Sequence, residues 1–303
     1  MPNLKFAFLG SSELSIYVLE ELLKLGYPPA LIVTLPGQPR GRGLNLQDNI
    51  VKTWAEEKGL PVLIPAKFNS EETEKILAQY DMALVASFGK IISERILLAP
   101  KKGILNIHPS LLPKYRGPSP IQAQILADEK EIGVSIIKLD KEVDHGQLLA
   151  QEKLPKVLNL LKEPINFNEL EKITAIAGAK LFVKISSDYL ENKIKLVEQN
   201  HTGATFTKKI EKNDGLLDLE FDKPYDCYLK TLAYSDWPGT FFFLPPRHQN
   251  ATPPKKGGDE AKEKKLRVII KESEYKDGAF YILKVLPEGK KEMPYDDFLR
   301  GLK

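Results

Sequence analysis

Cysteine is nearly absent from this 303-residue chain, since Cys227 is the only one. A single thiol excludes an intramolecular disulfide framework and a cysteine-rich zinc site. Long apolar runs are missing as well: no stretch reaches the roughly 20 residues that span a bilayer, and the N-terminal apolar run is too short for a signal peptide. We therefore expect a cytoplasmic protein that makes no membrane contact.

A strong excess of one charge is missing too. Lys and Arg total 44 against 41 Asp and Glu, which gives a net charge of +3 at neutral pH. This balance does not indicate a nucleic-acid binder by charge alone, although it is compatible with a local basic surface. Apolar residues make up 42% of the chain, enough to bury the core of one large domain or two ordinary ones.

The first half of the chain alternates short apolar runs with amphipathic segments. This alternation favours a mostly parallel sheet with helices on both faces, and such sheets bind ligands beyond the carboxyl ends of their strands. The turn after the first strand has only one glycine, Gly10, which excludes a dinucleotide fingerprint. Strands are expected at residues 6–9, 31–34, 82–87, 104–107 and 134–139, and helices at residues 14–25, 50–58 and 166–187.

The second half has a different character and predicts a small β-rich domain such as a barrel. The predicted boundaries are a first domain at 1–188, a linker at 189–203 and a second domain at 204–303. The polar, Pro- and Lys-rich stretch 245–265 is typical of a loop. Strands are expected at residues 202–209, 239–243, 266–271 and 280–285, with one short helix near 224–233.

The most informative segment is Gly103–Gln122, GILNIHPSLLPKYRGPSPIQ. Its expected strand alternates, so Asn106 and His108 point to the same side at the carboxyl end of the strand. Pro109 and Pro113 then force a rigid, irregular path. A lone histidine is often a satisfied core residue, and this segment alone leaves that interpretation of His108 open.

A carboxylate follows another expected strand, in the segment Asp140–Gly146, DKEVDHG. A carboxylate near an imidazole favours the charged ring and fixes its tautomer, and an asparagine beside them can donate to a developing oxyanion. These side-chain types suit acyl transfer through a tetrahedral intermediate. A covalent mechanism does not fit, because no nucleophile accompanies them and Cys227 falls in the other domain.

The glycine-rich loop at 36–43, PGQPRGRG, is the best candidate for a basic contact surface. Glycines make this loop flexible, and Arg40 and Arg42 can reach phosphates or base edges. A solvated surface turn is the alternative interpretation.

The run Asn106–Pro113, NIHPSLLP, resembles the signature of the folate-dependent formyltransferases. Its continuation, Tyr115–Gln122, is similar to the branch of that family that acts on methionyl-tRNA. The resemblance implies a Rossmann-like, mostly parallel sheet followed by a C-terminal OB-like barrel. Further similarities cover nearly the whole chain, at residues 8–12, 41–43, 87–89, 133–146, 237–239, 289–293 and 298–301.

The resemblance also implies roles for particular residues. Asn106, His108 and Asp144 would be catalytic, and Arg42 falls on the arginine with which the family's loop contacts tRNA, with Arg40 beside it. The implied donor is 10-formyltetrahydrofolate, and the implied acceptor is the amino group of methionine on initiator tRNA, for translation initiation. No metal is implied, and we expect a monomer. The folate-contacting residues would be Ser110, Leu111, Leu112, Pro113, Phe88 and Gly89.

Two features depart from the family pattern. His145 follows Asp144 where the family usually has a small hydroxyl residue, so it is either an additional titratable group or a solvated loop histidine. The stretch 245–265 has no counterpart in the family's barrel.

Other functions stay open beside transfer to methionyl-tRNA. Formyltransferases that act on a sugar-nucleotide amine or on glycinamide ribonucleotide use the same three catalytic residues, although the latter enzyme typically has one domain and leaves 202–303 unexplained. A hydrolase that discards the formyl group has no need of the arginine–glycine loop. A non-enzymatic RNA-binding protein has no need of the catalytic trio.

Overall fold

The computed structural model describes residues 4–40, 45–154, 165–244 and 266–302. The chain forms two units: unit 1 comprises residues 1–124, 129–165 and 169–209, and unit 2 comprises residues 125–128, 166–168 and 210–303. Residues 189–209 thus belong to unit 1, while the boundaries expected at 188 and 204 stay predictions. The stretch 245–265 lies outside the described residues.

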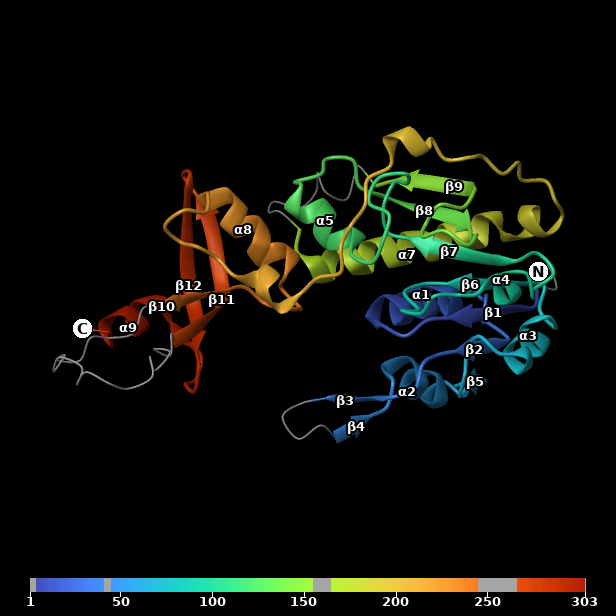
Figure 1. The fold of residues 1–303 in the computed structure, drawn as a ribbon, viewed down its shortest axis with the longest axis horizontal. Helices are drawn as coiled ribbons and strands as arrows, with labels where there is room; N and C mark the ends of the chain where they lie inside the picture. Colours follow the sequence, from blue (N-terminus) through green and yellow to red (C-terminus); the bar gives the residue numbers. More distant parts are fainter. Residues whose placement is uncertain (1–3, 41–44, 155–164, 245–265, 303) are drawn as a thin grey trace, which may run out of the picture. The chain divides into compact units, whose positions relative to one another are not determined.

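Unit 1 is built on a seven-stranded sheet of order β5-β2-β1-β6-β7-β8-β9 (Figure 1). The five strands from β5 to β7 are parallel, and β8 and β9 run antiparallel to their neighbours. This arrangement confirms the mostly parallel sheet expected from the alternating pattern. The strands are β1 Phe6–Leu9, β2 Leu31–Val33, β5 Val62–Leu63, β6 Met82–Val85, β7 Ile104–His108, β8 Gly133–Lys138 and β9 Leu148–Lys153.

Helices cover both faces of the sheet because its central strands are apolar on both sides. In β1, Ala7 and Leu9 pack in one cluster with Leu77 and Ile96 of the short helices α3 and α4. The ring of Phe6 lies 5.3 Å from that of Phe182 in the long helix α7. The helices that lie wholly or mostly in unit 1 are α1 Glu13–Lys24, α2 Ile50–Glu57, α3 Glu71–Leu77, α4 Glu94–Leu97, α5 Pro120–Leu126 and α7 Phe167–Leu190.

Helix α7 comes unusually close to β7, the strand that carries Asn106 and His108. A Cβ atom on Gly178 would lie 2.3 Å from the side chain of Ile107, so glycine is required there. The helix predicted at 166–187 is confirmed and extends to Leu190, and those predicted at 14–25 and 50–58 are confirmed as α1 and α2.

Unit 2 contains a four-stranded antiparallel sheet of order β10-β11-β12-β13 in its described residues. Its core packs Phe242, Val268 and Val285 against Cys227, and burial raises the pKa of that thiol. The helix and the last three strands predicted here are confirmed, and the OB-like barrel stays a prediction. The elements are α8 Pro224–Ala233, β10 Phe241–Leu244, β11 Leu266–Lys276, β12 Ala279–Pro287, β13 Met293–Pro294 and α9 Tyr295–Arg300.

The strand expected at 202–209 is wrong. A 3₁₀ turn occupies His201–Gly203, and only Phe206 makes a bridge, to Arg116. The backbone of this segment bonds to the irregular loop after β7: the N–H of Arg116 donates to Thr205 O at 2.8 Å, and Arg116 O accepts from the N–H of Thr207 at 2.7 Å. Residues 202–209 have strand-like side chains, but a single loop residue offers too few backbone hydrogen-bond partners for them to form a strand.

Candidate active site

The strand β7 places Asn106 and His108 on one side of the sheet, as their spacing predicts. Asn106 pairs in register with Val85 of β6, and His108 pairs with Ser135 of β8. His108 is 3% exposed and Asn106 is partly buried. Rigid neighbours on both sides therefore fix where the amide and the imidazole lie.

Asp144 reaches these two side chains by an unexpected route. Because β8 is antiparallel to β7, its carboxyl end lies beside Leu105, away from the end that carries His108. The connection of residues 139–147, between β8 and β9, places Asp144 beside Asn106 and His108. A mostly parallel sheet leaves the direction of this strand open, and it is the connection after β8 that brings the carboxylate to β7.

The Asp144 carboxylate contacts three groups. Its Oδ1 accepts a hydrogen bond from Asn106 Nδ2 at 3.3 Å and lies 3.6 Å from His108 Nδ1. Its Oδ2 accepts from the backbone N–H of Gly117 at 2.8 Å. The structure thus brings together the three side chains that the sequence analysis singled out, from positions up to 38 residues apart.

The tautomer of His108 follows from its other contact. Its Nε2 lies 3.0 Å from the backbone oxygen of Tyr115, and a carbonyl can only accept, so Nε2 carries a hydrogen. Nδ1 is therefore the nitrogen that gains or loses a proton, and it is the one that faces Asp144. This arrangement suits an imidazole that stabilises negative charge near a carboxylate.

Tyr115 is itself held in place. It has a left-handed backbone, with φ of +63°, and its hydroxyl donates to Glu129 Oε2 at 2.9 Å. Burial and this bond raise the pKa of Tyr115 to about 12. Burial opposes ionisation of Glu129, but hydrogen bonds from Lys114, the N–H of Glu131 and Tyr115 outweigh it and lower the pKa of Glu129 to about 2. Tyr115 thereby links the imidazole to a partly buried carboxylate.

Gly117 is required where it donates to Asp144. Its φ is +110°, and a Cβ atom there would lie 2.8 Å from the backbone oxygen of Thr207. Only glycine allows this close approach and turns the N–H toward the carboxylate.

The predicted folate-contacting residues of the loop after β7 fall in two groups. Ser110 and Leu112 are buried: the Ser110 hydroxyl donates to Lys114 O, and the Leu112 N–H donates to Ser135 Oγ. Leu111 and Pro113 line a cavity of about 370 Å³. Asn106, His108 and Asp144 are not among the residues that line it. The folate contacts of all four residues stay predictions.

The other predicted folate contacts follow β6. Phe88 is buried against Phe68, with ring centroids 4.7 Å apart, and its backbone oxygen accepts from Ser11 Oγ at 2.9 Å. Gly89 is exposed and has φ of +73°. Since β6 lies next to β7, this turn borders Asn106, but its folate contact stays a prediction.

The arginine–glycine loop is described in part. Strand β3, Gln38–Arg40, pairs antiparallel with β4, Asn45–Gln47, so the chain forms a hairpin whose first strand ends at Arg40. Arg42 lies outside the described residues. Contacts of Arg40 and Arg42 with tRNA stay predictions.

Sequence reasoning missed a second group of residues behind Asp144. Gln199 and Arg116 are each 3% exposed and hydrogen-bond to one another. His145 contacts two other side chains. Its Nδ1 lies 2.7 Å from Asp140 Oδ2, and its ring stacks on that of His201 with the ring centroids 4.1 Å apart. Arg116 lies within the motif itself, but Gln199 is 83 residues away and carries no local signal.

Two further classes of feature have no candidate in the described ranges. There, no group of three or more His, Cys, Asp or Glu side chains is arranged to hold a metal ion. None of the helices in the described ranges is long and apolar enough to cross a membrane.

Comparisons with known proteins show the family of this chain. Residues 4–167 match the model of the formyl transferase family. The chain is 37% identical over 242 residues to a methionyl-tRNA formyltransferase of Chloroflexus aggregans, covering 79% of this chain and 76% of that protein. It is 33% identical over 307 residues to the Thermus thermophilus methionyl-tRNA formyltransferase, covering 98% and 96%. Its fold resembles that of the Helicobacter canadensis N-formyltransferase in complex with folinic acid and dTDP-3-aminofucose, with a TM-score of 0.56 and 20% identity over 76% and 80% of the two chains.

Proposed function

The chain belongs to the family of methionyl-tRNA formyltransferases, and on that premise we propose that Asn106, His108 and Asp144 carry out its formyl transfer. The donor is 10-formyltetrahydrofolate, and the acceptor is the amino group of methionine on initiator tRNA. The protein acts as a monomer in the cytoplasm. The single observation that carries the proposal is the contact of Asp144 with both side chains of β7.

The reaction forms a bond between the acceptor nitrogen and the formyl carbon and breaks the bond from that carbon to N10 of the folate. One proton leaves the amine, and one reaches N10. Negative charge develops on the formyl oxygen, so the site needs hydrogen-bond donors there and a base for the amine.

The three side chains supply these groups. An amide nitrogen has two hydrogens, and Asn106 uses one of them on Asp144, which leaves the other for the formyl oxygen. His108, protonated at Nδ1, adds a positive charge beside that oxygen. The Asp144 carboxylate takes the proton of the attacking amine, directly or through a water molecule. Its own position is fixed by the N–H of Gly117.

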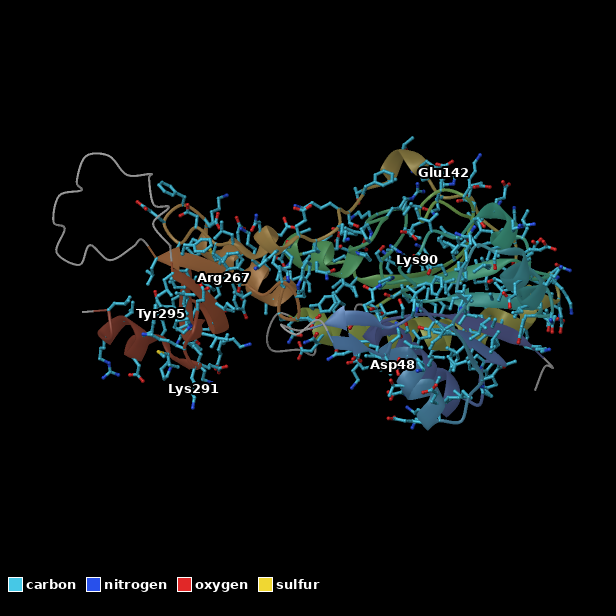
Figure 2. All side chains as sticks on the ribbon, turned by 60° about the horizontal axis from the view of Figure 1, so that its bottom comes forward. Asp48, Lys90, Glu142, Arg267, Lys291 and Tyr295 are labelled. Atoms are coloured by element: carbon cyan, nitrogen blue, oxygen red, sulfur yellow. The ribbon has the colours of Figure 1, made fainter. Side chains whose placement is uncertain are left out.

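Two segments beside the trio fit a planar, partly apolar folate. The turn after β6 exposes Ser87, Gly89 and Ile91, the last at 87%. The 139–147 connection exposes Val143 at 64%. Exposed apolar side chains suit contact with the face of a ring system. Lys90 and Glu142, labelled in Figure 2, mark these two segments on unit 1.

The decisive experiment measures release of tetrahydrofolate with different acceptors. We expect purified protein to release it from 10-formyltetrahydrofolate only when methionyl initiator tRNA is present. A sugar nucleotide with a free amine and a reaction without acceptor are the matched controls. Release without acceptor would identify a hydrolase, and release with the sugar nucleotide alone would identify an enzyme of that branch.

A further inference from the structure

Arg116 is a buried cation whose hydrogen-bond partners are neutral. Within the part of the chain that the structure describes, its guanidinium donates to Gln199 Oε1 at 3.1 and 2.6 Å and to His201 Nδ1 at 2.8 Å. A guanidinium only donates, so Nδ1 of His201 accepts and that imidazole is neutral. Burying a charge among neutral groups is unfavourable. The arrangement therefore calls for a role beyond packing.

Gln199 uses both ends of its side chain. Its Oε1 accepts from Arg116, and its Nε2 donates to the backbone oxygens of Asp144 at 2.9 Å and of Gly146 at 2.7 Å. Carbonyl oxygens only accept, and a guanidinium only donates, so the amide can point in only one direction. Arg116 thus orients the amide that holds the connection of residues 139–147.

The backbone that Gln199 holds is in an uncommon conformation. Asp144 has φ of +48°, in the left-handed region that residues other than glycine rarely adopt. At Gly146 a Cβ atom would lie 1.8 Å from the backbone oxygen of Lys138, so the chain there is packed tightly. If the peptide after Asp144 relaxed, its carboxylate would turn away from Asn106 and Gly117.

We propose that Gln199 is a positioning residue for the reaction: through its two hydrogen bonds to the 139–147 connection it holds the Asp144 carboxylate against Asn106 and His108. Arg116 fixes the orientation of its amide. This inference rests on the proposed catalytic role of Asp144. A misplacement of a catalytic group by about 1 Å can slow a reaction by about a hundredfold, so the two bonds have a measurable consequence.

The connection has other ties that remain when Gln199 is changed. His145 stacks on His201 and contacts Asp140, and Gly117 still donates to the Asp144 carboxylate. A Gln199 variant is therefore expected to keep the fold of the connection and to lose only its alignment.

Two substitutions separate positioning from simple support of Arg116. Gln199→Met removes both functions, whereas Gln199→Glu keeps an acceptor for Arg116 and removes the amide hydrogens. We expect each to lower kcat at least about tenfold, with KM for both substrates within about twofold of wild type. Gln79→Met, at an exposed position in the turn after α3, is the control. A normal kcat for Gln199→Glu would mean that Gln199 only supports Arg116, and the proposal would be overturned. If Gln199→Met does not fold, the kcat of Gln199→Glu alone decides between these outcomes.

A double-mutant cycle shows whether the effect passes through Asp144. In an Asp144→Ala background, changing Gln199 to Glu should alter the residual kcat less than about twofold, because the group it positions is gone. The same tenfold loss in that background would overturn the proposal. A normal kcat for Asp144→Ala alone would instead refute the catalytic role of Asp144, so the two failures are distinguishable.

Discussion

At the scale of single residues, most polar groups of the site already have a fixed hydrogen-bond partner. The backbone oxygen of Tyr115 keeps a hydrogen on His108 Nε2, and the N–H of Gly117 occupies one oxygen of Asp144. What remains is one Asn106 hydrogen and His108 Nδ1, both beside the other carboxylate oxygen. In the proposed mechanism these donors for a developing oxyanion are set before substrate binds, which is the condition for electrostatic catalysis.

The first prediction concerns these donors. Asn106→Ala should lower kcat at least about a hundredfold, because one lost oxyanion donor raises the barrier by about 3–4 kcal/mol. Asp144→Ala should have an effect of at least the same size. Single-turnover kinetics with methionyl-tRNA, together with the Kd for the folate donor, provides the measurement, and Asn213→Ala at an exposed position of unit 2 is the control. Near-normal turnover with intact folate binding would refute the assignment.

At the scale of elements, the irregular loop after β7 is held by side chains rather than by a sheet. Tyr115 and Lys114 both bond to Glu129, which follows α5. The backbone of the loop also pairs with residues 205–207. This support places the Tyr115 oxygen that His108 needs, so the carboxylate of Glu129 stabilises the site as well as the fold.

The second prediction follows from the pKa of Glu129, about 2 when folded against 4.5 as its ordinary value. A carboxylate with a lowered pKa stabilises the fold fully above its unfolded pKa, and the contribution disappears as the pH falls through the folded pKa. Glu129→Gln should therefore be less stable than wild type by about 1–2 kcal/mol at pH 7. The gap should narrow as the pH falls from 4.5 toward 2.

Urea titrations at pH 7 and pH 3 measure this difference in the free energy of unfolding. Glu57→Gln, at an exposed position of α2, is the matched control and should show no such gap. A gap of equal size at both pH values would mean that Glu129 acts by shape and not by charge.

At the scale of the whole molecule, the net charge of +3 is small for an enzyme whose acceptor, tRNA, is a polyanion. Attraction to tRNA must then come from local groups. Some basic side chains are already engaged, such as Arg267, whose guanidinium lies 3.8 Å from the ring centre of Phe241 in unit 2. Others, such as Lys291, are exposed (Figure 2). The arginine–glycine loop at 36–43 supplies two further cations.

The third prediction tests that loop. Arg42→Ala should raise the KM for methionyl-tRNA about tenfold and leave the KM for the folate donor unchanged, because a contact with phosphate is lost. The slope of log KM for tRNA against log salt concentration should fall by about 1. Lys58→Ala, which removes one charge from the exposed end of α2, is the control. An unchanged salt slope would exclude a phosphate contact at Arg42.

Much of the fold could be predicted because its signals are local. The all-buried runs of β1 and β6 and the helical spacing of α1 and α7 arise from residues a few positions apart. The strand expected at 202–209 was wrong because strand-like side chains form a strand only where a partner strand exists.

The amino-acid sequence by itself determined the longer elements of unit 1, the common face of Asn106 and His108, and the family to which the chain belongs. It did not predict β3, β4, β5, β9, α3 or α4. Only the tertiary structure decided that β8 runs antiparallel, that the 139–147 connection returns Asp144 to β7, and that Gln199 holds it there. The physical reason is the separation of the interacting residues along the sequence, because side-chain periodicity reports only on residues a few positions apart. The bonds from Asp144 to Asn106, from Gln199 to Asp144 and from Arg116 to Gln199 join groups 38, 55 and 83 positions apart, and they exist only once the chain has folded.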